Sequence, residues 1–416
     1  MPQTTISAPS HLATPSAAPS RAAAPLATTF GYYLVFVVLG LVAASLGPTL
    51  PDLAANTRSQ LSQVSVLFLA NSAGRIVAAL GIARLYDRWP GHPVMAGMLA
   101  LLAIMMALVP VTPVLGLLAL VLFGRGLAQG TIDLGGNALL IWVHGARVGP
   151  YMNGLHFAFG VGAFLAPVII AQVVLATGSV TWAYWALAAT ALPAALWIAL
   201  LPSPPNPAQQ RRGPDGEANF LLVALIVLFF GLYVGAEVGF GSWLFSYARA
   251  LQLADATAAA YMTAAYYGTY TIGRLLAIPI AARLSPRLLL GGSLTASLAA
   301  MGIVLLGWRS PTTTWIGALG LGLGMAAIFP TMFSLAERHM HISGQISGWF
   351  FFGGSMGGMT LPWLIGQIFE GLGPRAAMTA IFVDLALTTI VFGLLMLAAH
   401  ARVPATGQAP QGTHRR

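Results

Sequence analysis

Long apolar runs separated by short polar gaps recur along almost the whole chain. Crossing about 30 Å of hydrocarbon takes roughly 20 residues of helix at about 1.5 Å each, so runs of this length predict transmembrane helices. Cutting the sequence at its charges, prolines and glycines gives twelve spans: 30–51, 61–84, 92–110, 114–142, 150–176, 181–201, 219–247, 257–283, 288–307, 313–336, 344–368 and 375–399.

Composition supports the same class of protein. Of the 416 residues, 7% are charged and 57% are hydrophobic, whereas a soluble globular chain carries about 25% charged residues. The chain is therefore predicted to be an all-α, multi-pass protein of the lipid bilayer. Its net charge of +9 comes from scattered arginines without a basic face, so no nucleic-acid partner is expected. The lack of Cys excludes disulfides and thiolate metal sites.

The polar segments divide the chain into five parts. The longest internal gap, 202–218, is predicted to be a cytoplasmic linker between a six-helix bundle at 29–201 and a second at 219–400. Residues 1–28, rich in Ala, Pro, Ser and Thr, cannot build a core and are predicted to be a disordered tail. Residues 401–416 form the C-terminal tail.

The arginines predict the orientation of the chain in the membrane. With cytoplasmic termini, four arginines lie outside (Arg58, Arg249, Arg309 and Arg375) and twelve lie in cytoplasmic segments. Since cytoplasmic loops carry the excess of positive charge, both termini are expected in the cytoplasm. The expected location is a cell membrane, taken to be a bacterial inner membrane.

Two segments recur in the same order and orientation in the two halves. "GRIVAALGIARL" at 74–85 matches "GRLLAIPIAARL" at 273–284, and a Gly-x4-Pro-x4-Gln frame occurs at 162–172 and again at 357–367. The offsets are 199 and 195 residues. Such parallel repeats are typical of six-plus-six transporters with a substrate site at mid-membrane between the halves. The sequence thus predicts two pseudo-symmetric six-helix halves, in a chain expected to be a monomer.

Particular motifs resemble the major facilitator superfamily. "ARLYDRWPGHP" is similar to its cytoplasmic loop signature, with Asp87 and Arg88 at positions to which the family assigns gating, although Ala83 stands where the signature begins with Gly. Three further stretches, "QGTIDLGGN", "NGLHFAFGVGAFLAP" and "YVGAEVGFGSWLFSY", resemble the fucose/galactose/glucose symporter branch and the related sodium-dependent glucose transporters. This resemblance implies the major facilitator fold and sugar transport driven by a co-transported proton or sodium ion.

Ionisable residues inside the spans are candidate functional groups. Each costs about 2.5–3.5 kcal/mol on insertion scales, so each is expected to face the bundle interior or a water-filled cavity. Structural ion pairing between helices is the alternative. Three bases, Arg75, Arg125 and Arg274, are predicted to act in charge pairs or gating. Asp384 in the last span receives no role.

One stripe of the fourth span carries four polar side chains. Arg125, Gln129, Asp133 and Asn137 follow at i, i+4 spacing, which places them on one helix face. Carboxylates and amides arranged in this way can bind vicinal hydroxyls. Gln129, Asp133 and Asn137 are therefore predicted substrate ligands.

Glu237 is the first candidate for the coupling site. It lies in "GAEVGFG" with no arginine expected at its level, and an acid that gains and loses a proton there can carry it across. Asp133 is the second candidate. The other predicted substrate contacts are polar or aromatic residues of spans five, seven, eight and eleven, for which helix packing is the alternative: Asn153, His156, Trp243, Tyr267 and Trp349.

The favoured function is symport of a monosaccharide with a proton or sodium ion, by rocking of the two halves. Proton-coupled efflux of small polar or amphipathic compounds is the main alternative, and a sugar sensor that does not transport is a remote one. The sequence has no nucleotide-binding glycine loop and no metal-binding motif. The protein is therefore expected to have no enzyme activity, no cofactor and no metal site.

Overall fold

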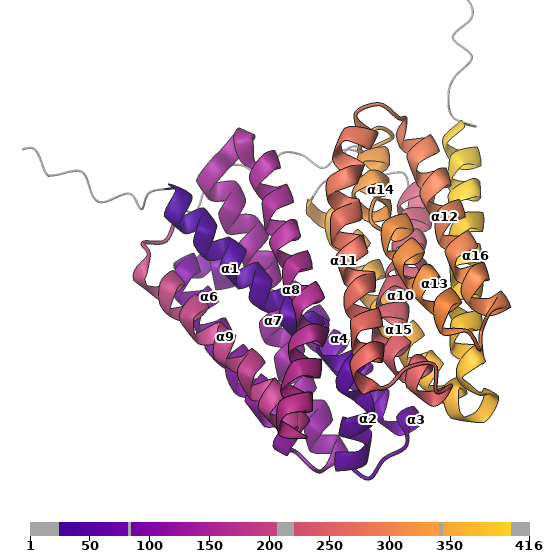
Figure 1. Ribbon diagram of the computed structural model, residues 1–416. Helices are drawn as coiled ribbons and strands as arrows, with labels where there is room; N and C mark the ends of the chain where they lie inside the picture. Colours follow the sequence, from indigo (N-terminus) through magenta and orange to yellow (C-terminus); the bar gives the residue numbers. More distant parts are fainter. Residues whose placement is uncertain (1–24, 82–84, 206–219, 341–343, 401–416) are drawn as a thin grey trace, which may run out of the picture.

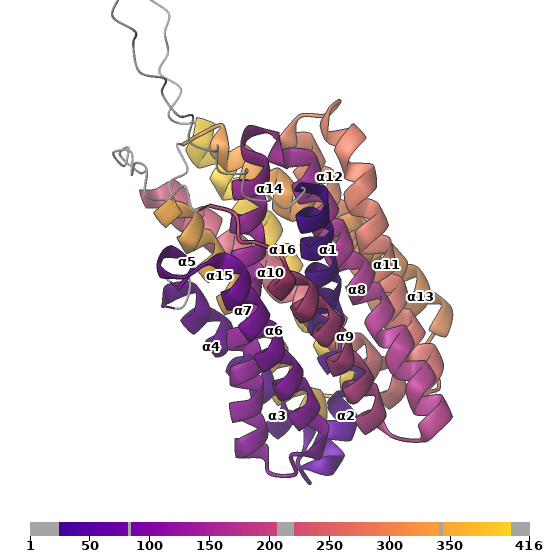
Figure 2. The same ribbon diagram turned by 90° about the vertical axis from the view of Figure 1, so that its left-hand side faces the viewer.

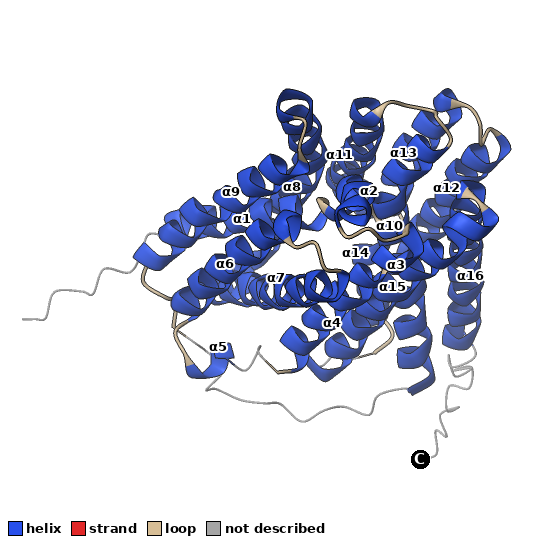
Figure 3. Cartoon of the chain, turned by 90° about the horizontal axis from the view of Figure 1, so that it is seen from below, coloured by secondary structure: helices blue, strands red, loops and turns tan. Residues whose placement is uncertain are grey.

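The computed structural model describes residues 25–81, 85–205, 220–340 and 344–400. Over these ranges the regular structure consists of helices, with no strand (Figure 3). The first part of the chain forms α1 Pro25–Ala43, α2 Leu46–Asn56, α3 Leu61–Val64, α4 Val66–Leu80, α5 Leu85–Arg88, α6 Gly91–Leu108, α7 Leu115–His144, α8 Val148–Thr177 and α9 Val180–Leu200. The second forms α10 Phe220–Ala250, α11 Ala256–Ala281, α12 Pro286–Leu306, α13 Pro311–Met325, α14 Ile328–Glu337, α15 Gly344–Leu372 and α16 Pro374–His400.

One helix, or two consecutive helices, lies at each predicted span. Among the described residues, ten such stretches are long and apolar enough to cross a membrane, and α11 and α15 are not among them. Both helices pack on the opposite half, α11 on α8 and α15 on α4. The chain is an all-α, multi-pass membrane protein.

Proline divides two spans that the sequence predicts as continuous. Helix α1 ends at Ala43 and α2 begins at Leu46, because Pro48 has no N–H for the Ala44 carbonyl and its ring crowds that group. Pro330 has the same relation to Ala326, and α13 and α14 separate there. These interruptions correct the prediction of unbroken helices.

The ends of the spans also differ from the prediction. Helix α1 begins at Pro25, inside the segment predicted to be a tail, since proline is well suited to the first position of a helix. The rest of that tail, most of the predicted linker and the predicted C-terminal tail lie outside the described residues.

The helices form two bundles side by side (Figure 1). Helices α6 and α9 lie on the outer side of the first bundle (Figure 2), and α12 and α16 on that of the second. Helix α1 begins and α16 ends at the same end of the molecule, called here the terminal end; α2 and α3 lie at the opposite, distal end. The bundles meet at the distal end, where α2 packs on α10 and α3 on α15, and diverge towards the terminal end.

Candidate functional site

Close packing of α4 on α7 positions the first group of polar side chains. Gly126 of α7 lies against the Asn71 carbonyl of α4 and has no room for a Cβ atom, and Gly130 lies close to the backbone of Arg75. Only glycine allows two helices to approach this closely. The approach brings the Arg75 side chain to the level of Asp133.

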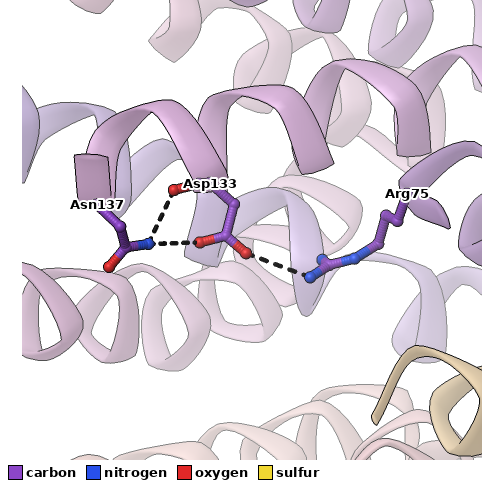
Figure 4. Close-up of polar contacts among 3 residues, drawn as sticks. All are labelled: Arg75, Asp133 and Asn137. Carbon is purple, nitrogen blue, oxygen red and sulfur yellow. Dashed lines mark hydrogen bonds and ion pairs between the residues drawn. The ribbon is translucent and has the colours of Figure 1, made fainter. Parts of the chain in front are cut away.

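Arg75, Asp133 and Asn137 form a connected set of polar contacts, called here the Asp133 group (Figure 4). The Nη2 atom of Arg75 lies 3.3 Å from Oδ2 of Asp133. The Asn137 amide donates to Oδ1 of Asp133 at 3.2 Å and to its backbone carbonyl at 2.8 Å. The Arg75 and Asp133 side chains are 34% and 37% exposed, so the ion pair has open sides where another polar molecule can bind.

The other half of the stripe on α7 is buried. Arg125 donates from Nη2 to the Val42 carbonyl at 3.2 Å, at the C-terminal end of α1, where a cation is favourable. Its Nε and Nη1 atoms, and Oε1 of Gln129, have no hydrogen-bond partner among the described residues. Arg125 therefore stabilises the break after α1, and Gln129, which is 2% exposed, lies outside the open part of the stripe.

A second group of polar side chains lies on α10 and α11 and is called here the tyrosine group: Tyr233, Glu237, Tyr266, Tyr267, Tyr270 and Arg274. Arg274 donates to the Tyr270 hydroxyl at 2.8 Å, and its guanidinium carbon lies 4.6 Å from the centre of that ring. The Tyr270 hydroxyl is 3.1 Å from that of Tyr233. Tyr233 was not among the predicted site residues, although Tyr233 and Glu237 have the same i, i+4 spacing as the stripe on α7.

Glu237 has an arginine nearby, contrary to the expectation that none lies at its level. Arg274 is close enough to interact with it electrostatically, but the described residues show no ion pair between them. The side chain of Glu237 is partly buried. Its backbone carbonyl accepts a hydrogen bond from Tyr266 at 3.2 Å.

His156 of the first bundle lies near the tyrosine group of the second. It lies on α8 with its ring edge-on to Phe36 at 6.1 Å, and it interacts electrostatically with Arg274 on α11. Tyr267 belongs to the tyrosine group, with its ring 5.0 Å from that of Tyr266. Asn153, one turn before His156, is exposed.

Two of the predicted aromatic contacts are not brought to either group. Trp243 is fully buried against Phe68 and Phe369, and its Nε1 donates to the Pro362 carbonyl at 2.9 Å. It belongs to the contact between the bundles at the distal end. Trp349 is 50% exposed near the start of α15 and packs edge-on against Phe352.

The remaining predicted residues lie apart from both groups. Arg88 is exposed at the end of α5, and the side chain of Asp87 lies outside the described part of the molecule. Asp384, on the outer helix α16, is buried, and its Oδ2 has no hydrogen-bond partner within the described residues. Among those residues, no set of three or more His, Asp or Glu side chains could hold a metal ion.

Comparison with known proteins identifies the family. Residues 32–362 match the family model of the major facilitator superfamily, and the chain belongs to this superfamily. It is 28% identical to the mouse sodium-dependent glucose transporter 1A over 80% of this chain and 88% of the relative. It is 29% identical to the human sodium-dependent glucose transporter 1 over 82% of this chain and 73% of the relative.

Solved structures of transporters share the fold. A mutant of the nucleoside transporter NupG superposes with a TM-score of 0.71 and 14% identity, covering 90% of this chain and 99% of that one. A bacterial homologue of the human lysosomal transporter Spinster, in an inward-facing and occupied conformation, gives 0.69 and 14%, covering 92% and 98%. The architecture described above is thus the major facilitator fold, as the sequence predicted.

Proposed function

We propose that this protein is a secondary active transporter that carries a monosaccharide together with a proton or a sodium ion. The substrate would bind between the Asp133 group and the tyrosine group and be exposed alternately at the two ends of the molecule. The relatives named sodium-dependent glucose transporters support sugar as the substrate and a cation as the co-transported ion.

The observation that carries the proposal is the partly exposed ion pair inside membrane-spanning helices. Keeping charge at this depth is costly, and ionisable residues inside membrane helices commonly mark the path of a substrate or an ion. The Asp133 carboxylate offers acceptors, and Arg75 and Asn137 offer donors, within one connected set. A sugar hydroxyl both donates and accepts, so it can replace one contact without leaving another group unpaired.

We assign coupling to Glu237 first and Asp133 second. Glu237 is an acid within electrostatic reach of Arg274 but without an ion pair among the described residues. Gaining a proton or a sodium ion would change the charge facing the site. We further propose that the protein works as a monomer in a cell membrane, the inner membrane of a bacterium, with both termini in the cytoplasm.

Uptake by purified protein in liposomes tests the proposal. Glucose, galactose and fucose are supplied under an inward sodium gradient, an inward proton gradient, or neither. We expect one sugar to accumulate under one of the gradients, and to leak out when an ionophore collapses it. Absence of uptake for all sugars under both gradients would refute the proposal. Release of protons into the sugar-containing medium on sugar addition would instead indicate exchange of sugar for protons.

A further inference from the structure

The repeated Gly-x4-Pro-x4-Gln frame has a structural role at the contact between the two bundles. It contains Gly162, Pro167 and Gln172 in α8, and Gly357, Pro362 and Gln367 in α15. None of these residues belongs to the Asp133 group or the tyrosine group. The two copies lie 195 residues apart, so a shared role should appear twice.

The glycines of the two copies make equivalent contacts within their own bundles. Gly162 lies against the Val37 carbonyl of α1, and Gly357 lies against the Gly231 carbonyl of α10. Neither position has room for a Cβ atom. Each glycine thus fixes its helix closely against the first helix of the same bundle.

The glutamines of the two copies reach the opposite bundle. Gln172 donates from Nε2 to the Tyr261 hydroxyl on α11. Gln367 donates from Nε2 to the Ser62 carbonyl at 2.8 Å and to the Ser65 hydroxyl at 3.0 Å. The first contact joins α8 to α11. The second joins α15 to α3 and to Ser65, the C-cap residue of α3.

Gln172 and Gln367 lie close to the C-terminal ends of α8 and α15, and these ends lie towards the distal end, where the bundles meet (Figure 1). Ser242 of α10, which is 8% exposed, lies against Gly47 of α2 in the contact between the bundles. Glu370 strengthens the contact of α15, since its carboxylate accepts from the Leu61 amide at 2.9 Å and from the Ser62 hydroxyl at 3.0 Å.

We infer that Gln172 and Gln367 are a symmetry-related pair of latches that hold the distal end closed while the terminal end is open. Opening the distal end requires the bundles to separate there, so both hydrogen bonds must break in each cycle. The inference depends on the proposed transport cycle for its meaning, but its test needs neither a substrate nor an ion gradient.

The test measures how often the distal end opens. Because the chain has no cysteine, Ser242→Cys supplies one probe between the bundles, and its reaction with a bulky hydrophilic maleimide is timed in lipid nanodiscs. Gln172→Met and Gln367→Met keep the side-chain length but cannot donate a hydrogen bond. The matched controls are Thr177→Ala in α8 and Thr360→Ala in α15, whose hydroxyls bond only within their own bundle.

We expect Gln172→Met to speed labelling about fivefold, the factor that corresponds to one ordinary hydrogen bond. Gln367→Met should have a smaller effect because Glu370 still holds α15, and the double variant should exceed both. The controls should stay within about twofold of the parent, a margin below the effect of one hydrogen bond. A double variant that labels no faster than the controls would overturn the inference. If a Met variant does not give a monodisperse protein, Gln172→Asn and Gln367→Asn replace it, because the shorter side chain cannot reach the opposite bundle. Their labelling rates are compared with those of the same controls.

Discussion

At the scale of single residues, Asp133 is the acid on which the proposed substrate site depends most. We predict that Asp133→Asn lowers sugar uptake by about 10- to 100-fold, the range given by loss of a hydrogen bond to a charged group. The melting temperature should fall by only a few degrees, because the pair with Arg75 is more than a third exposed on the Asp133 side and such pairs contribute about 1 kcal/mol or less. Uptake assays and thermal unfolding measure the two effects.

The double variant Arg75→Gln/Asp133→Asn separates binding from simple ion pairing. If Asp133 only neutralises Arg75, removing both charges should restore uptake. If it binds the sugar, the double variant should stay inactive, also in exchange of labelled for unlabelled sugar. An Asp133→Asn protein that folds and transports at the parent rate would exclude both roles.

Glu237 should behave differently if it carries the coupling ion. We predict that Glu237→Gln abolishes accumulation driven by a cation gradient but keeps exchange of sugar at equal concentrations, since exchange does not require the ion to be released. Asp384→Asn is the control, because Asp384 is also an acid inside a membrane-spanning helix but lies on the outer helix α16. Loss of exchange together with accumulation in Glu237→Gln would place Glu237 in sugar binding instead.

At the scale of elements, the interruption between α1 and α2 fixes the surroundings of Arg125. We predict that Pro48→Ala lets a continuous helix form, since alanine can donate to the Ala44 carbonyl. The Val42 carbonyl would then turn away from Arg125, which now donates to it at 3.2 Å. Uptake and the melting temperature should both fall, because the buried Arg125 guanidinium would lose its hydrogen bond to the Val42 carbonyl.

Pro51→Ala is the control for this prediction. Pro51 lies inside α2, where the helix is continuous, so its replacement should leave uptake close to that of the parent. Equal losses in both variants would mean that uptake does not depend specifically on the interruption at Pro48, and would contradict the prediction. Helix content measured by circular dichroism would check that Pro48→Ala extends the helix.

Helical spacing predicted part of the site, and the limits of that prediction have physical causes. The i, i+4 pattern placed Asp133 and Asn137 on one stripe, and they are in contact. The same pattern could not show that Gln129 lies in the buried part, because burial depends on the break after α1 and on the approach of α4. The contact of Tyr270 with Tyr233 was also hidden, since Tyr233 comes from another helix.

At the scale of the whole molecule, the fold could be predicted because the bilayer restricts the possibilities. Spanning segments must be helices of a certain length, and the repeats fixed the division into halves. Which residues meet across the bundles could not be predicted, as Trp243 shows. As an aromatic residue of the seventh span it was predicted to contact the substrate, whereas it packs against Phe68 of the opposite bundle. Contacts of this kind depend on which end of the molecule is closed.

The direction of the molecule in the membrane is a last testable consequence. Twelve passes place both termini on one side, and Arg58, Arg249, Arg309 and Arg375 belong to the end opposite them. Because arginine is enriched in cytoplasmic loops, this sparsely charged distal end should face outward.

We predict that Thr312→Cys, at the exposed start of α13, reacts with an impermeant maleimide on intact cells. Ala282→Cys, exposed at the other end, should react only after permeabilisation. The reverse labelling pattern would mean that the distal end faces the cytoplasm. The substrate would then reach the Asp133 group of this structure from outside the cell.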